Sequence, residues 1–411
     1  MQQLYHQTEK TNHSKLKPNE DKEILQGFPW VFDNEILSVK NVDEKLSLTD
    51  GSEVDVFSKS GNYLGTGIYN QKSKITVRIL SRNKDVVFDN EFFEKRIQDA
   101  LDIRFMYYKK SDSYRLIFAE ADYLPGLIVE RYVDVEGRVF LVVQFLSLSA
   151  EIFRDKIISS LNMLCHPFGI YERSDVDVRD KEGLEQKKGW IGSEHNPVIT
   201  IKENGILLTV DLENGQKTGY FLDQKFNRKK VAELSKNKKV LDTFTHTGAF
   251  GLNAFYGGAS SVVSVDISEE AVETVRTNII QNKASKVMKA ICADVFDFLK
   301  EEEKNGSLYD LIILDPPAFA KSAKSLDKAY GGYKEINLRA MRILKEGGIL
   351  VTCSCSHFFD EVKFCDMLMH SAKDSHRSVQ ILEKTGAGPD HPVLSGYPKS
   401  SYLKCIIAKV N

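Results

Sequence analysis

The sequence predicts an α/β protein whose C-terminal half is a doubly wound sheet, preceded by a small β-rich domain and an α+β domain. From about residue 200, strand-like apolar runs alternate with amphipathic helical segments, which is the pattern of a parallel sheet with helices on both faces. Before residue 88, short alternating runs are punctuated by glycines, as in hairpins or a small barrel. A chain of 411 residues is also too long for one ordinary core.

The amino-acid composition indicates a soluble globular protein. Hydrophobic residues make up 42% of the chain and charged residues 28%, as in soluble globular proteins. No apolar run approaches the roughly 20 residues that span a bilayer, and the polar N-terminus lacks the apolar core of a signal peptide. We therefore expect a cytoplasmic protein without membrane contact. The net charge of −2 neither indicates nor excludes nucleic-acid binding, because a local basic patch is enough.

The N-terminal half divides into three predicted parts. Residues 1–16 are polar and predict a disordered arm, and residues 17–88 predict the β-rich domain, with the alternation at Lys74–Leu80 favouring a strand. Residues 89–195 predict an α+β domain. It begins with helical spacing over residues 91–108 and contains strands near 124–132 and 138–145.

Residues 196–411 predict the doubly wound domain. Its expected strands are 206–211, 239–244, 261–266, 289–294, 311–315 and 348–354, with late strands at 378–384 and 402–410. Helical segments such as Ser268–Lys283 separate most of them. In such sheets, ligands bind at the carboxyl ends of the strands, so functional residues are sought there.

The first three strand ends have features of a nucleoside site. Gly248 and Gly251 follow the first strand, but they do not form the full dinucleotide pattern G-x-G-x-x-G. Asp266 ends the second strand, where a carboxylate accepts hydrogen bonds from ribose hydroxyls; alternatively, it caps the helix that follows. Asp294 follows the third strand, where it could receive an adenine amino group, with Val295 and Phe296 against the ring.

The fourth strand is followed by Asp-Pro-Pro-Ala-Phe, residues 315–319. Two prolines cannot donate to a strand ladder and they hold the backbone extended. The motif therefore predicts a stiff ledge with Asp315 at its rim, able to hold a flat ring that carries an amine. A purely structural turn is the alternative.

Two of the six cysteines, Cys353 and Cys355, lie one residue apart at the end of the last parallel strand. We expect the strand to end near Cys353, with Cys353 in the core and Cys355 on the loop at the mouth of the site. A zinc site is not expected, because no other thiol or histidine cluster accompanies the pair.

Together these motifs resemble a known family. TFTHTGAFG (243–251), VDIS (265–268), ADVFDF (293–298), LDPPAF (314–319) and TCSCS (352–356) occur in the order and spacing of class I S-adenosylmethionine-dependent methyltransferases. DLENGQKTGYFLDQKFNR (211–228), FPWVFDNEI (28–36), YRLIFAEADYLPGLIVERY (114–132) and IYERSDVDVRDKEGLE (170–185) resemble a narrower group. This group is the PUA-domain methyltransferases that form 5-methylcytosine in 23S ribosomal RNA.

The resemblance implies a fold and a set of site residues. The doubly wound domain would be a Rossmann-like class I methyltransferase domain, residues 17–88 a PUA RNA-binding domain, and residues 89–195 a connector. The implied cofactor is S-adenosylmethionine, and no metal is implied. The residues implied to bind it are Phe221, Asp223, Gln224, Thr243, Thr245, Thr247, Gly248, Asp266, Ile267, Asp294, Val295 and Asp315. Pro316, Pro317 and Phe319 would hold the target base, and Cys355 and Asp315 would be catalytic.

The implied chemistry explains the thiol. Carbon 5 of a pyrimidine is a poor nucleophile, and addition of a thiolate to carbon 6 turns the ring into an enamine that attacks the methyl group. Some RNA cytosine methyltransferases have a second cysteine in the fourth-strand motif, where this chain has Ala318, so a mechanism with one cysteine is expected. The acceptor of the carbon-5 proton is not identified; His357 and His391 are candidates.

The implied partner is 23S ribosomal RNA, and the resemblance allows a homodimer. The target base must be flipped out or already unpaired, so we expect stacking residues such as Phe319 and Tyr333 around the ledge. Two basic runs could contact phosphates or could be solvated helix faces: Lys225, Arg228, Lys229 and Lys230, and Lys321, Lys324 and Lys328. Two other functions stay open. One is methylation of a guanine or adenine nitrogen in ribosomal RNA without a thiol, and the other is RNA binding by an inactive methyltransferase fold.

Overall fold

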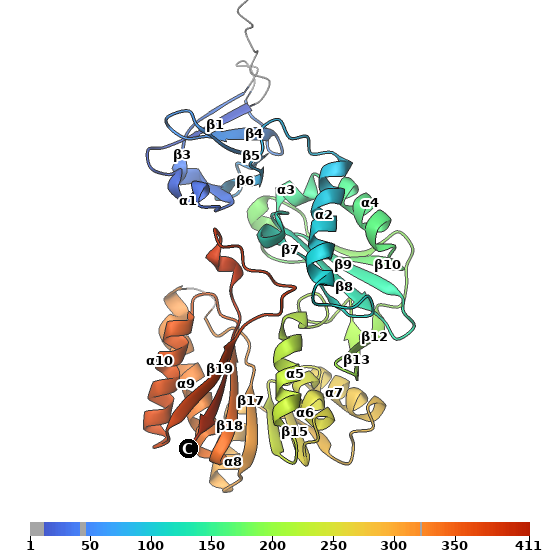
Figure 1. The fold of residues 1–411 in the computed structure, drawn as a ribbon, viewed down its shortest axis with the longest axis vertical. Helices are drawn as coiled ribbons and strands as arrows, with labels where there is room; N and C mark the ends of the chain where they lie inside the picture. Colours follow the sequence, from blue (N-terminus) through green and yellow to red (C-terminus); the bar gives the residue numbers. More distant parts are fainter. Residues whose placement is uncertain (1–11, 42–46, 321–322) are drawn as a thin grey trace, which may run out of the picture. The chain divides into compact units, whose positions relative to one another are not determined.

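The computed structural model describes residues 12–41, 47–320 and 323–411. They form two compact units, each assembled from several parts of the chain. The first unit contains residues up to 197 together with 212–218 and 389–400, and the second contains 198–211, 219–388 and 401–411. Figure 1 shows the helices and strands of both units.

The first sheet of the first unit has six strands in the order β2-β6-β5-β4-β1-β3. Its elements are β1 (Asn12–Leu16), α1 (Lys22–Leu25), β2 (Trp30–Phe32), η1 (Asp33–Glu35), β3 (Ile36–Lys40), β4 (Glu53–Phe57), β5 (Tyr63–Tyr69) and β6 (Ile75–Ser81). Leu16, Val54 and Val77 are fully buried between them. The alternating, glycine-punctuated region before residue 88 therefore forms a small β-rich fold.

The expected disordered arm is wrong for residues 12–16. They form β1, which pairs in parallel with β4 and antiparallel with β3. Ser14 and Leu16 are fully buried. The sequence NHSKL has one apolar residue, so its strand is fixed by backbone pairing on both sides rather than by its own pattern. Residues 1–11 of the expected arm lie outside the described part of the chain.

The second sheet of this unit has five strands in the order β11-β10-β9-β8-β7. Its elements are α2 (Asn90–Phe105), β7 (Tyr114–Phe118), η2 (Ala119–Asp122), β8 (Leu127–Val133), β9 (Val139–Phe145), α3 (Leu148–Glu151), α4 (Arg154–Cys165), β10 (Gly169–Ser174), η3 (Asp180–Glu182) and β11 (Lys187–Ile191). Helix α2 packs on α4 and β7. Its apolar residues Phe93, Ile97 and Leu101 are buried, whereas Phe105 at its end is 45% exposed.

The second unit contains a hairpin and a seven-stranded sheet in the order β16-β15-β14-β17-β18-β20-β19. Its strands are β12 (Val198–Glu203), β13 (Ile206–Asp211), β14 (Lys239–Thr243), β15 (Ser261–Asp266), β16 (Met288–Cys292), β17 (Tyr309–Leu314), β18 (Leu344–Ser354), β19 (Val379–Thr385) and β20 (Lys404–Val410). Strands β14 to β18 run parallel, and β20 is inserted antiparallel between β18 and β19. The predicted doubly wound α/β fold is confirmed. The predicted strand at 206–211 instead pairs with β12 in a separate two-stranded sheet.

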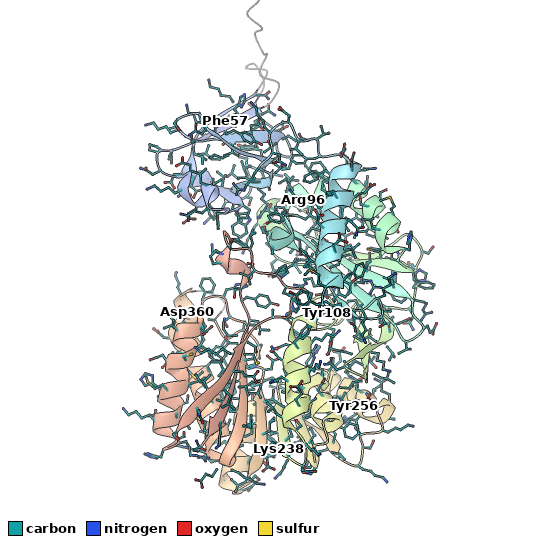
Figure 2. The ribbon with its side chains drawn as sticks, viewed as in Figure 1. Phe57, Arg96, Tyr108, Lys238, Tyr256 and Asp360 are labelled. Carbon is teal, nitrogen blue, oxygen red and sulfur yellow. The ribbon has the colours of Figure 1, made fainter. Side chains whose placement is uncertain are left out.

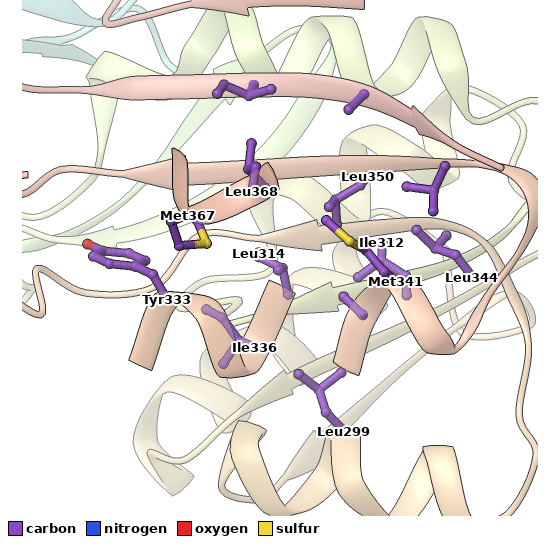
Figure 3. Close-up of a cluster of buried hydrophobic side chains, with 14 of the residues drawn as sticks. Leu299, Ile312, Leu314, Tyr333, Ile336, Met341, Leu344, Leu350, Met367 and Leu368 are labelled. Carbon is purple, nitrogen blue, oxygen red and sulfur yellow. The ribbon is translucent and has the colours of Figure 1, made fainter. Parts of the chain in front are cut away.

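Helices cover this sheet, and they position its strand ends. They are η4 (Leu222–Gln224), α5 (Lys225–Leu234), α6 (Ala249–Tyr256), α7 (Glu269–Gln281), α8 (Val295–Lys304), η5 (Ala323–Ser325), α9 (Leu326–Arg342) and α10 (Glu361–Asp374); η6 (Pro398–Ser400) belongs to the first unit. Figure 3 shows Ile312 and Leu350 of the sheet packed against Leu299, Ile336 and Met367 from the helices. This closely packed core holds the carboxyl ends of the parallel strands in fixed positions.

The division into units differs from the predicted boundary at residue 196, because segments 212–218 and 389–400 belong to the first unit. Buried polar contacts hold the second of these segments there. The Arg115 backbone N–H donates to the Asp390 carboxylate at 2.9 Å, and Arg104 donates to the Asp390 carbonyl at 3.0 Å. Such contacts join residues some 275 positions apart, and no local pattern in the sequence indicates them.

Candidate active site

The parallel strands of the second unit end at one edge of the sheet. In the register, Thr243 of β14 lies between Val265 of β15 and Leu314 of β17, and Leu314 pairs with Thr352 of β18. The segments that follow these strands therefore meet along the same edge. They begin with Phe244, Ile267, Ala293, Asp315 and Cys355. The structure thus brings together the strand-end residues that the sequence singled out.

The loop between β14 and α6 turns sharply at the carboxyl end of the first strand. Phe244, His246 and Gly248 all have positive φ values of 56°, 53° and 80°, so the chain turns sharply three times within five residues. At Gly251, a Cβ atom would lie 2.5 Å from the Ser264 hydroxyl. Gly251 lies in α6, so a side chain there would push this helix away from β15.

A buried carboxylate that the sequence reasoning missed, Asp242, holds this loop. It accepts hydrogen bonds from the Thr245 hydroxyl, from the Gly251 N–H at 2.9 Å and from the Ser264 hydroxyl at 3.0 Å. Burial raises the pKa of Asp242 to about 6, although these hydrogen bonds oppose the shift. An acid inside an otherwise apolar strand was the available signal for it.

The hydroxyl groups of Thr243 and Thr245 are hydrogen-bonded within the protein. The Thr243 hydroxyl donates to the Ile313 carbonyl at 2.8 Å, and the Thr245 hydroxyl is bound to Asp242. Thr245 and Thr247 are only 6% and 7% exposed. The expected cofactor contacts of the Thr243 and Thr245 side chains are therefore not supported.

Asp266 is fixed at the end of β15. Its carboxylate accepts the His246 N–H at 2.9 Å and the Ser268 N–H at 3.1 Å. The cap of α7 is Ser268, whose hydroxyl accepts from Ala271. Asp266 is half-buried and, with two oxygens and several lone pairs, it still has capacity to accept from ribose hydroxyls. The next residue, Ile267, is 67% exposed.

Asp294 and Val295 lie at the start of α8. One Asp294 carboxylate oxygen caps the helix by accepting from the backbone of Phe296 at 2.8 Å and of Asp297 at 3.2 Å. The expected contact between the Val295 side chain and an adenine ring is not supported, because Val295 is 2% exposed and packs in the core. The half-buried Phe296 is the accessible apolar side chain here.

The segment Phe221–Gln224, which precedes the seven-stranded sheet in the sequence, contacts residues of the site. The Phe221 ring meets the His246 ring edge-on at 5.0 Å. Asp223 and Gln224 are 3% and 2% exposed, which is too deep for the direct cofactor contact expected of their side chains. Gln224 instead donates its amide N–H to the Asp315 carboxylate at 3.0 Å, and so fixes the acid at the rim of the ledge.

Asp223, in the same segment, is hydrogen-bonded to residues near the end of the chain. The Tyr402 hydroxyl donates to it, and the Asp223 carbonyl accepts the Gly388 N–H at 2.9 Å. These bonds join η4 to the chain on either side of the segment 389–400.

The proline ledge follows β17. Pro316 is buried, Pro317 is exposed and Phe319 is half-buried. The Phe319 ring lies 4.7 Å from the Tyr333 ring. The Ala320 N–H donates to the Ser356 hydroxyl at 3.2 Å, so the ledge is tied directly to the loop that carries Cys355.

The two cysteines separate as expected. β18 ends at Ser354, with Cys353 fully buried and Cys355 half-buried on the loop that follows. Cys353 faces Cys405 of β20, and this contact together with burial raises its pKa. The Ser354 and Ser356 hydroxyls on both sides of Cys355 bind the Tyr333 hydroxyl, each at 3.0 Å. The Cys355 loop is therefore rigidly held.

Tyr333 does not stack on a substrate as expected, because it is fully buried. Its ring lies parallel to Phe359 at 4.9 Å, and burial raises the pKa of its hydroxyl. It supports the Cys355 loop and the underside of Phe319.

A second residue that the sequence reasoning missed is Lys404, the first residue of β20. Its amine donates to the Ser356 carbonyl at 2.7 Å and to the Tyr402 carbonyl at 2.8 Å. Burial lowers the pKa of Lys404 to about 8, and the neighbouring Cys355 and Asp360 oppose that shift.

The two histidine candidates for the proton acceptor lie in different surroundings. His357 is exposed, with its ring 5.6 Å from the Tyr402 ring. His391 belongs to the first unit, where it is 4% exposed and its Nδ1 lies 3.0 Å from the Asp390 carboxylate. Because His391 is buried in that ion pair, we do not expect it to accept the carbon-5 proton.

The first basic run is not a phosphate-binding surface as a whole. Arg228 is 2% exposed and pairs with Glu203 at 2.7 Å, and Lys225 is also buried. Lys230 pairs with Glu383 at 2.9 Å. The lysines of the two runs that remain exposed are Lys229, Lys324 and Lys328, and Lys321 lies outside the described residues.

The described residues also exclude two other kinds of feature from the part of the chain that they cover. They contain no group of three or more His, Cys, Asp or Glu side chains arranged to hold a metal ion. They also contain no helix that is both long and apolar enough to cross a membrane.

The family and sequence matches of this chain agree with a methyltransferase site at the carboxyl ends of the strands. Residues 178–406 match the model of the S-adenosylmethionine-dependent methyltransferases, and residues 15–82 match a PUA-like domain. The chain is 41% identical over 394 residues to ribosomal RNA large subunit methyltransferase I of Photobacterium profundum, covering 95% of this chain and 97% of that protein. It is 39% identical over 401 residues to the protein of the same name from Aliivibrio fischeri, covering 96% and 98%.

Two solved structures share the fold along almost the whole chain. A putative S-adenosylmethionine-dependent methyltransferase from Streptococcus mutans superposes with a TM-score of 0.78 at 24% identity, covering 97% of this chain and 99% of that one. A putative methyltransferase crystallised with SAH gives a TM-score of 0.79 at 23% identity, with the same coverage. At this level of identity, the likeness shows the fold.

Proposed function

We propose that this chain, which belongs to the family of S-adenosylmethionine-dependent methyltransferases named ribosomal RNA large subunit methyltransferase I, methylates carbon 5 of a cytosine in 23S ribosomal RNA. The observation that carries the proposal is the position of Cys355. Its half-buried thiol lies on a loop at the edge where the strands end, and that loop is bonded to the proline ledge through Ser356 and Ala320.

The cofactor is S-adenosylmethionine, and it supplies a methyl group on a sulfonium. The residues present fit such a group. The loop at 244–248 follows the first strand at the carboxyl edge of the sheet and is close to the Asp266 carboxylate, which accepts the His246 N–H. We propose that Asp266 binds the ribose hydroxyls and that the backbone around Asp294, beside Phe296, receives the adenine.

Cys355 is the proposed nucleophile. Its thiolate forms a bond to carbon 6 of the cytosine, which places electron density on carbon 5 so that carbon 5 accepts the methyl group. After the transfer, carbon 5 loses its proton and the carbon–sulfur bond breaks, so the thiolate is regenerated. Asp315, held by Gln224, is placed to hydrogen-bond the N3 or amino group of the ring, which fixes the orientation of the ring.

The proline ledge and the first domain are the parts of the protein proposed to bind the RNA. Pro316, Pro317 and Phe319 form the proposed seat of a flipped base, with Phe319 supported from below by Tyr333. The PUA-like domain at residues 15–82 is the proposed RNA-binding module. We expect the enzyme to act in the cytoplasm, where ribosomes are assembled, and a homodimer stays a prediction.

A methylation assay with matched cysteine variants tests the proposal. Cys355→Ala should abolish transfer to 23S ribosomal RNA. Cys353→Ala, which removes a buried thiol two residues away, should retain it. Nucleoside analysis of the product should show 5-methylcytosine. Methylation of a guanine or adenine nitrogen that survives Cys355→Ala would overturn the proposal in favour of an enzyme that needs no thiol.

A further inference from the structure

Lys404 lies beside the Cys355 loop because of the strand register. It is the first residue of β20 and pairs across the sheet with Ser354, the last residue of β18. From there its amine reaches the carbonyl of Ser356 at 2.7 Å. The Lys404 side chain therefore spans the stretch of backbone that contains Cys355.

We propose that Lys404 is a positioning residue whose ammonium group fixes the Cys355 loop and stabilises the Cys355 thiolate by its charge. The inference rests on the proposed function, in which that thiolate is the nucleophile. The two carbonyl oxygens, of Ser356 and Tyr402, use two N–H groups of the amine. An ammonium has three, so these two bonds leave one N–H group of the amine, whose charge already acts on Cys355.

The surrounding groups favour a charged amine at neutral pH. Burial lowers the pKa of Lys404 to about 8, and the charges of Cys355 and Asp360 raise it back toward its ordinary value. Asp360 caps α10 and is labelled in Figure 2. The other titratable or charged groups around this loop are the buried Tyr333, Cys353 and Cys405, Asp315 of the ledge, Tyr402, the exposed His357, and Lys363, which pairs with Asp360. Lys404 is a half-buried cation beside this loop, and its charge is lost only as the pH rises through about 8.

The positive charge of Lys404 should lower the pH at which the Cys355 thiol ionises. A cation within a few ångströms favours the thiolate and shifts its titration by about 1–3 pH units. Removal of the charge should therefore raise the pH at which Cys355 reacts with an alkylating reagent, and the effect should not depend on RNA or on methyl transfer. This separates a failure of the inference from a failure of the proposed function.

The experiment measures alkylation of Cys355 by iodoacetamide in the full-length protein from pH 6 to pH 10, resolved by peptide mass spectrometry. The variants are Lys404→Met, Lys404→Gln, which keeps hydrogen-bond donors without the charge, and Lys404→Arg, which keeps the charge. Lys409→Met is the matched control, since Lys409 lies on the same strand with its side chain near Gly347. The exposed Cys292 reports on the reagent in every sample.

We expect the half-maximal pH for Cys355 to rise by about one unit in Lys404→Met and Lys404→Gln, with alkylation about tenfold slower at pH 7. Lys404→Arg and Lys409→Met should stay close to wild type. Unchanged melting temperature and SAH binding establish that the variants fold. A wild-type pH profile in both uncharged variants overturns the inference. A shifted profile in a protein that methylates no cytosine supports the inference and refutes the proposed function.

Discussion

Replacing Asp242 by asparagine should change how stability depends on pH, because this carboxyl group is fully buried and its pKa is raised from an ordinary 3.8 to about 6. The folded protein then holds the proton more tightly than the unfolded chain does. The stability contributed by Asp242 is therefore highest below pH 3.8, falls as the pH rises through about 6, and is constant above that. Asparagine does not titrate, so this dependence disappears in the variant.

The magnitude follows from the shift in the pKa of Asp242. About two units at 1.4 kcal/mol each give about 3 kcal/mol. Groups elsewhere titrate equally in both proteins, so they cancel in the difference between wild type and Asp242→Asn. Above pH 7 the variant loses the charge but keeps one oxygen to accept from Thr245, Gly251 and Ser264, so its loop should stay folded.

The assay is urea unfolding of wild type and Asp242→Asn at intervals from pH 4 to pH 8, followed by fluorescence and circular dichroism. The difference in unfolding free energy should change by about 2.5 kcal/mol across this range, most of the full effect, with wild type gaining relative to the variant as the pH falls. A difference that stays flat from pH 4 to pH 7 would refute the reasoning, since Asp242 would then titrate alike in the folded and unfolded chains.

Three further substitutions have distinct expected outcomes. Gln224→Leu removes the bond that fixes Asp315 and should lower the methylation rate about ten- to hundredfold, while calorimetry shows unchanged SAH binding. Asp266→Ala should weaken SAH binding about ten- to hundredfold by calorimetry, as expected for hydrogen bonds to a charged group; binding equal to wild type would exclude its ribose role. Arg228→Met leaves the buried Glu203 without its ion-pair partner and should destabilise the second unit by about 3–5 kcal/mol in urea unfolding; a loss below 1 kcal/mol would contradict this.

The sequence predicted those parts of the fold that depend on local periodicity. Alternating strand and helix patterns gave the parallel sheet, and the carboxyl-end rule for such sheets then placed Asp266, Asp315 and Cys355 at one edge. The prediction of Cys353 in the core and Cys355 on the loop is confirmed; it depended on the expected end of the strand and on the frequency of buried free cysteines.

The remainder depends on contacts between residues far apart in the chain. Lys404 acts on a loop 48 positions earlier, and Gln224 binds an acid 91 positions later. The expected stacking role of Tyr333 was wrong for the same reason. Its ring is enclosed by Phe319 and Phe359 from separate segments, and only packing reveals this.

The central claim is a bond between Cys355 and a cytosine ring. The most direct measurement is the mass of the protein after incubation with S-adenosylmethionine and 23S ribosomal RNA fragments that contain 5-fluorocytosine, in which fluorine replaces the proton that must leave. We expect a stable covalent complex in wild type and in Cys353→Ala, with the nucleotide mapped to the peptide that carries Cys355, and none in Cys355→Ala. Methyl transfer to ordinary RNA without any trapped complex, or a complex that persists in Cys355→Ala, would contradict the account.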